Sequence, residues 1–146
     1  MSTRASIKVV DGYRSLRFYK HWDGYPEHTL PLLKLPMKWM KEEKLRKSVG
    51  QFSGWLILIG AAEYEKKIPP EEENIDSWKC GAIEPTDSVH GDEEYFYTLN
   101  LKEEYIEIKH HDRVIKTVQD DFSLTKEEND SVRIFNSDGS VENFNF

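Results

Sequence analysis

The fold is decided by residues 94–118, EYFYTLNLKEEYIEIKHHDRVIKTV. Apolar side chains alternate with polar ones along this stretch, and Tyr97, Leu99, Ile106 and Ile108 all belong to the apolar series. Strict alternation is typical of a strand that buries one face. The stretch therefore predicts an antiparallel meander of three strands, over residues 94–101, 105–109 and 114–118, with a turn at His111-Asp112.

The N-terminal residues predict a hairpin. Residues 6–20 alternate in the same way on both sides of Asp11-Gly12, and Gly readily takes the positive φ that tight hairpin turns need. The expected core side chains are Ile7, Val9, Leu16 and Phe18.

Helical spacing follows a loop at residues 22–29. Thr29 is a candidate N-cap for a first turn that contains Pro31, and Pro36 predicts a break, because proline removes a backbone donor and clashes with the preceding turn. A helix restarting at Pro36 is expected to run to about Lys47. A second, more buried helix is predicted over residues 53–66 with Ser53 as its N-cap, and a buried strand over residues 55–59 is the alternative.

These elements predict an α+β fold. The antiparallel sheet combines the N-terminal hairpin with the C-terminal meander, and the two helices pack on one face. Further strands are expected at residues 78–83, 132–135 and 141–146, and residues 67–77 are expected to form a polar connection. The chain, residues 1–146, is predicted to be one domain, in which residues 112–146 form an added C-terminal hairpin extension.

Composition narrows the class of protein. The chain carries 27 acidic and 20 basic residues, a net charge of −7, which argues against general affinity for nucleic acid. A single cysteine, Cys80, excludes an internal disulfide and a cysteine-based zinc site. No apolar stretch is long enough for a transmembrane helix and no export signal is visible, so the expected location is the cytoplasm, or the host cytoplasm if a phage encodes the chain.

Two short clusters combine histidine with carboxylates next to predicted strands. The candidate binding residues are His21, Asp23 and Tyr25 in the first cluster and His90, Asp92 and Glu93 in the second. If the clusters meet, His21, Asp23, His90 and Asp92 supply the nitrogen and oxygen ligands that suit Zn, Mn or Fe. A water molecule on such an ion becomes a nucleophile near neutral pH. The structural alternative is that these are ordinary turn residues, and otherwise no cofactor is expected.

Other patterns have structural interpretations. His110 and His111 adjoin the predicted turn and are interpreted as ordinary turn-proximal residues. Neighbours on a strand point to opposite faces, so the pair is not expected to share one ion. The six basic residues within 34–47 are interpreted as a solvated helix face. Tyr95, Phe96 and Tyr97 are interpreted as core and cross-strand packing in preference to a base-stacking platform.

Two stretches carry a resemblance to a family. Residues 18–27, FYKHWDGYPE, and residues 90–101, HGDEEYFYTLNL, resemble elements shared by small uncharacterised proteins of bacteria and their phages. The resemblance covers residues 5–108, and His28 stands where the family tends to have Gly. It implies no activity, but it directs attention to the same two clusters.

No nucleotide-binding or hydrolase motif is present, so the sequence favours a non-catalytic accessory protein that binds a protein partner or a small ligand. A small metal-dependent hydrolase, or another ligand-binding enzyme, using the two His/Asp clusters is one alternative. A self-associating structural domain is another, with the aromatic residues 144–146 in an exposed edge strand. Acidic residues, including Glu93, Glu94, Glu104 and Glu107, also allow a surface that mimics nucleic acid.

Overall fold

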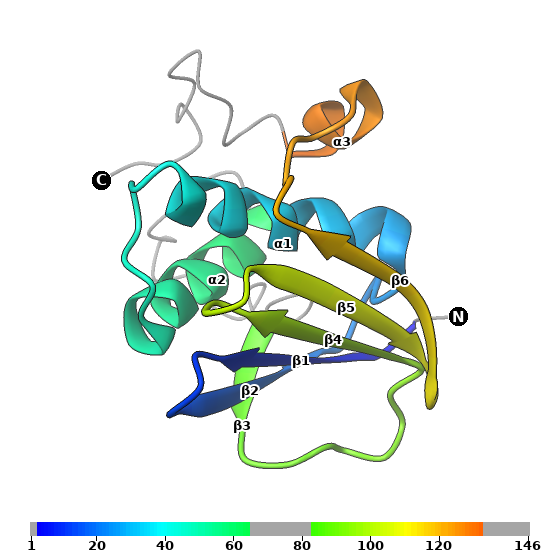
Figure 1. Cartoon of the computed structure of the whole chain (residues 1–146). Coiled ribbons are helices and arrows are strands. Elements are labelled where there is room, and N and C mark those ends of the chain that lie inside the picture. The colour runs from blue at the N-terminus through cyan, green and yellow to red at the C-terminus, as the bar shows by residue number, and fades with distance from the viewer. Residues whose placement is uncertain (1–2, 65–82, 133–146) are drawn as a thin grey trace, which may run out of the picture.

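Six strands form one sheet in the order β3-β2-β1-β4-β5-β6 (Figure 1). The computed structural model describes residues 3–64 and 83–132. The strands are β1 (Ala5–Val10), β2 (Ser15–Lys20), β3 (Ile83–Thr86), β4 (Tyr95–Asn100), β5 (Tyr105–His110) and β6 (Arg113–Gln119). The predicted α+β class is confirmed, as are the N-terminal hairpin β1–β2 and the meander β4–β5–β6.

The hairpin and the meander are joined by a parallel pair, so the sheet is mixed and not wholly antiparallel. β1 runs parallel to β4, with Ala5 opposite Tyr95 and Val10 opposite Asn100. Parallel neighbours require a long crossover connection, usually a helical one. Here the chain between them contains β2, both long helices and β3.

Two helices, α1 (Pro26–Lys41) and α2 (Val49–Tyr64), lie on the same face of the sheet, as predicted (Figure 1). α2 packs over β1, β2 and β3, whereas α1 packs over β5 and against α2. Between the layers, alternate strand residues such as Ile7, Phe18 and Tyr97 are buried with Phe52 and Leu56 of α2. The apolar residues of the alternating pattern thus form the part of the core that the sheet contributes.

The predicted break at Pro36 is wrong. α1 continues from Pro26 to Lys41 with Pro31 and Pro36 inside it, its N-cap is Tyr25 and not Thr29, and it ends well before Lys47. An interior proline costs a helix about 3 kcal/mol. Ten α1 residues are buried, so packing against the sheet and α2 offsets that cost.

Other differences concern the ends of elements. The hairpin connection spans four residues, 11–14, in which the Asp11 side chain accepts hydrogen bonds from the amides of Tyr13 and Arg14. Leu16, predicted in the core, is 45% exposed, because β3 ends before it can cover that edge of β2. α2 is a helix and not a strand, and it begins at Val49, so Ser53 lies inside it.

A third helix, α3 (Lys126–Ser131), was not predicted. Thr125 and Glu128 form a capping box at its start, and each side chain bonds the backbone of the other residue. Val132, predicted to open a strand, is the C-cap residue of α3. The remaining residues of that predicted hairpin, the connection at 67–77 and most of the predicted strand at 78–83 lie outside the described residues.

The connection from β3 to β4 passes the face of the sheet that the helices leave open (Figure 1). On this face, Ser6 of β1 and Tyr19 of β2 are paired in register and both are buried. This connection, residues 87–94, carries the second predicted cluster. In the described part of the chain, no helix has the length and apolar character needed to cross a membrane.

Candidate functional site

The hydroxyl of Tyr19 connects the two predicted clusters. It donates to the Asp92 carboxylate, with distances of 2.9 Å to Oδ2 and 3.1 Å to Oδ1, and its oxygen lies 3.2 Å from His21 Nδ1. A hydroxyl has one proton to donate, so with Asp92 as acceptor the contact to His21 requires a proton on Nδ1. Tyr19 was not among the predicted site residues.

Ring and charge contacts reinforce this junction. The His90 ring stacks on Tyr19 with centroids 3.7 Å apart and planes 13° apart. Arg4 Nε lies 3.6 Å from Asp92 Oδ2, and the Arg4 guanidinium carbon lies 5.8 Å from the centre of the Trp22 ring. The side chains of residues 90 and 92 are therefore held on the open face of β2.

The environment keeps the Tyr19 hydroxyl protonated. Burial, followed by the hydrogen bond to Asp92, raises the pKa of Tyr19 to about 12. At neutral pH the group is a hydrogen-bond donor and not a nucleophile. The contacts of Tyr19 hold the connection between β3 and β4 against the sheet.

The other candidate residues make local contacts. The buried Glu93 carboxylate accepts hydrogen bonds from the amides of His90 (2.8 Å) and Gly91 (2.7 Å), and thereby closes the turn before β4. Asp23 has a positive φ of 52°, and its carbonyl accepts a hydrogen bond from the Thr29 hydroxyl. Tyr25 is the N-cap of α1.

The predicted metal site at His21, Asp23, His90 and Asp92 stays a prediction. Among the described residues, the group of three metal-ligand side chains within reach of one ion is a different one, Glu94, His110 and His111. The expectation that His110 and His111 point to opposite faces is wrong. β5 ends at His110, and His111 is a turn residue with a φ of 57°, which brings the ring centroids within 4.6 Å.

A cleft of about 880 Å³ lies at the edge of β2 beyond the end of β3. It reaches both faces of this edge, because Leu16 and Phe18 share the helix side whereas Lys8 and Arg17 belong to the open side. The remaining lining residues come from β2, α2, the end of β3 and the residue that follows it: Ser15, Gly50, Ser53, Gly54, Ile57, Pro85, Thr86 and Asp87.

Two cations and one hydroxyl of this cleft are notable. Lys8 and Arg17 lie directly opposite each other in the β1–β2 ladder, and neither forms an ion pair with a described acidic residue. Arg17 Nη1 donates to Ser6 Oγ at 2.6 Å. Ser53, which is 3% exposed, has no hydrogen-bond partner for its hydroxyl among the described residues.

The basic stretch does not form one solvated helix face. Lys34 is buried and its ammonium lies 2.8 Å from the Glu128 carboxylate. Lys47 and Lys41 both pair with Glu104, at 2.6 and 3.1 Å, and their hydrogen bonds lower the pKa of that carboxyl. Glu104 and the buried Glu93 are thus engaged within the fold, which weakens the case for an acidic surface that mimics nucleic acid.

These features define the protein as an α+β protein with a mixed sheet and an open cleft at one sheet edge. No family model, curated protein or solved structure matches the chain. The resemblance of residues 18–27 and 90–101 to a phage and bacterial family therefore stays a prediction.

Proposed function

We propose that this chain is a non-catalytic binding protein that holds a small organic anion in the cleft at the edge of β2. The observation that carries the proposal is the pairing of Lys8 with Arg17 across two adjacent strands, without a described acidic partner for either. Like charges placed directly opposite in a sheet destabilise it. A bound carboxylate or phosphate would remove that repulsion.

The position of Arg17 suits this role. Its hydrogen bond to Ser6 orients the guanidinium and uses one of five N–H donors. Planar guanidinium groups bind carboxylates and phosphates through paired hydrogen bonds, and Lys8 adds a second positive charge. Asp87 also lines the cleft, but it forms no ion pair with either cation.

The rest of the cleft suits an apolar ligand body. Leu16 and Ile57 are 45% and 39% exposed, and both line the cleft. Gly50 and Gly54 add no side chain on the α2 side, and the volume of about 880 Å³ lies in the usual range for small-molecule sites. The buried hydroxyl of Ser53 supplies a donor that a polar ligand atom would satisfy.

The experiment compares octyl phosphate with octanol as probes of thermal stability and in calorimetric titration. A ligand that binds the native state raises Tm, so octyl phosphate is expected to stabilise the chain more than octanol does. The double variant Lys8→Gln/Arg17→Gln should lose this difference. The matched control Lys102→Gln/Lys126→Gln removes the same charge from exposed positions outside the cleft and should keep it.

The double variant also reports on the repulsion itself. Without ligand it should be at least as stable as the original chain, because a like-charge pair is removed. An equal effect of octyl phosphate on both double variants, or no effect on the original chain, would contradict the proposal.

A further inference from the structure

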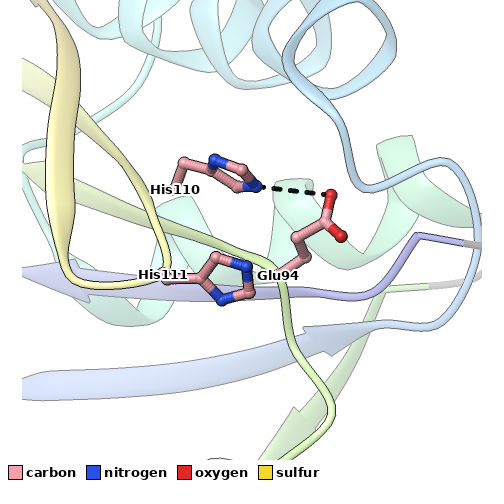
Figure 2. Close-up of side chains that lie close together, drawn as sticks. All are labelled: Glu94, His110 and His111. Atoms are coloured by element: carbon pink, nitrogen blue, oxygen red, sulfur yellow. Dashed lines mark ion pairs between the residues drawn. The ribbon is translucent and has the colours of Figure 1, made fainter.

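Glu94, His110 and His111 form a cluster at the end of the sheet opposite the hairpin turn of β1 and β2 (Figure 2). One potential metal-ligand atom from each side chain lies within 4.8 Å of the other two. The cluster is separate from the cleft at the edge of β2 and does not depend on the proposed function.

The turn between β5 and β6 places the two histidines. His110 is the last residue of β5, and His111 is the first of the two turn residues before Arg113. Histidine is one of the few side chains enriched at positive φ, and His111 has a φ of 57°. Outside the strand, His111 no longer follows the alternation of faces, so both rings lie near Glu94 (Figure 2).

Backbone hydrogen bonds fix the position of Glu94 relative to the turn between β5 and β6. The amide of His111 donates to the carbonyl of Glu94 at 2.7 Å, and the amide of Glu94 donates to the carbonyl of Arg4 at 2.9 Å. The His110 ring stacks on Tyr95, with centroids 4.8 Å apart and planes 23° apart. These contacts hold Glu94, His110 and His111 in place relative to the sheet.

We infer that Glu94, His110 and His111 bind one divalent transition metal ion, of which Zn²⁺ is the representative. Two imidazoles and one carboxylate form a three-ligand set that zinc accepts with water at a fourth position. Ligands about 2.0–2.1 Å from a tetrahedral ion lie about 3.3 Å from each other. His110 Nε2 and Glu94 Oε2 are already 3.6 Å apart (Figure 2).

The three side chains are exposed enough to move the short distance that binding an ion requires. The His110 and Glu94 side chains are 43% and 46% exposed, and His111 is exposed as well. An ion can therefore enter from solvent, and His111 can change rotamer without disturbing the core. The alternative is an ordinary contact between His110 and Glu94, and a titration with metal separates the two.

The test is calorimetric titration with ZnCl₂ of the full chain free of any histidine tag, supported by the absorption spectrum with Co²⁺. The original chain should bind one equivalent, and Glu94→Gln, His110→Asn and His111→Asn should each lower the affinity about tenfold or more. Asparagine accepts positive φ, so His111→Asn preserves the turn. His28→Asn, an exposed histidine on α1, is the matched control and should bind as the original chain does.

One further variant, His90→Asn, tests whether the metal binds instead at the site predicted from the sequence, which includes His90. The inference is supported if this variant binds Zn²⁺ as tightly as the original chain. It is overturned if the original chain binds no Zn²⁺, if binding survives the combined His110→Asn/His111→Asn change, or if binding is lost with His90→Asn and retained with His111→Asn.

Discussion

The Tyr19 hydroxyl donates to the Asp92 carboxylate at 2.9 Å, although 73 residues separate the two in sequence. This bond ties the connection between β3 and β4 to the open face of β2. A tyrosine that is 4% exposed thereby gains a charged acceptor for its hydroxyl. The relationship gives residues 18–27 and 90–101 a shared structural role.

Tyr19→Phe is expected to lower the free energy of unfolding by about 1–3 kcal/mol, because the ring remains but a hydrogen bond to a charged group is lost. Urea denaturation followed by circular dichroism measures the change. Tyr13→Phe is the matched control, since Tyr13 is 93% exposed, and it should have no effect. Equal stability of the two variants would show that the Asp92 contact does not stabilise the fold.

The tyrosines also predict how stability changes at high pH. Burial raises the pKa of Tyr19 to about 12, and burial raises the pKa of Tyr97 and Tyr95 as well. The unfolded chain releases these protons near pH 10, whereas the folded chain retains them. The contribution of Tyr19 is therefore complete below about pH 10 and is lost as the pH rises toward 12, and the contributions of Tyr97 and Tyr95 are lost in the same direction.

Unfolding free energies measured between about pH 9 and about pH 12 test this dependence. Tyr19→Phe should lose stability less steeply over this range than the original chain, because one group with a raised pKa is gone. Identical slopes for the two proteins would contradict the assigned role of Tyr19.

Lys34→Met is expected to lower the free energy of unfolding by about 2 kcal/mol. The change removes the ammonium that holds Glu128 at 2.8 Å, where the side chains are only 10% and 16% exposed, and so loosens α3 from α1. Lys38→Met on the same helix is the control, because its pair with Glu42 is 3.8 Å long and well exposed, and exposed pairs contribute about 0–1 kcal/mol. Chemical denaturation should separate the two variants, and equal losses would contradict the prediction.

Replacing glycine by alanine at two positions of α2 should have opposite effects on the stability of the chain. At Gly54 an added Cβ would meet no described heavy atom within 4 Å apart from its chain neighbours and the nearby backbone of α2, so Gly54→Ala should stabilise the chain by about 1 kcal/mol through helix propensity. At Gly60 a Cβ would lie 2.8 Å from the backbone nitrogen of Ile83, so Gly60→Ala should destabilise it. Thermal unfolding measures both, and a shared sign would mean that α2 does not approach β3 as described.

The sequence predicted most strands because alternation reports directly which face of a strand is buried. It could not predict the β1–β4 pair, since alternation does not say which strands are neighbours. Pro36 indicated a helix break because local backbone cost is visible in the sequence, whereas the compensating burial of α1 is not. Thr125 and Glu128 did carry a capping-box signal for α3.

The candidate sites were less predictable. The histidine clusters were visible, but Tyr19 had the pattern of an ordinary outward strand residue, and its contacts depend on how residues 87–94 return to the sheet. The turn predicted at His111-Asp112 implied that His111 need not follow the alternation of faces, but the sequence did not indicate that Glu94 lies beside it. The cleft had no sequence signal, because it depends on where β3 stops.

The parallel pairing of β1 with β4 has a consequence for the nascent chain. Residue 5 cannot pair with residue 95 until the intervening chain has been synthesised. Until then the N-terminal hairpin presents an unpaired strand edge, which is a site for association with other unfinished chains. Contacts between such distant residues also slow folding. We therefore expect the hairpin to pair with the rest of the sheet only after β4 has been synthesised, and truncation before β4 to leave a hairpin prone to aggregation.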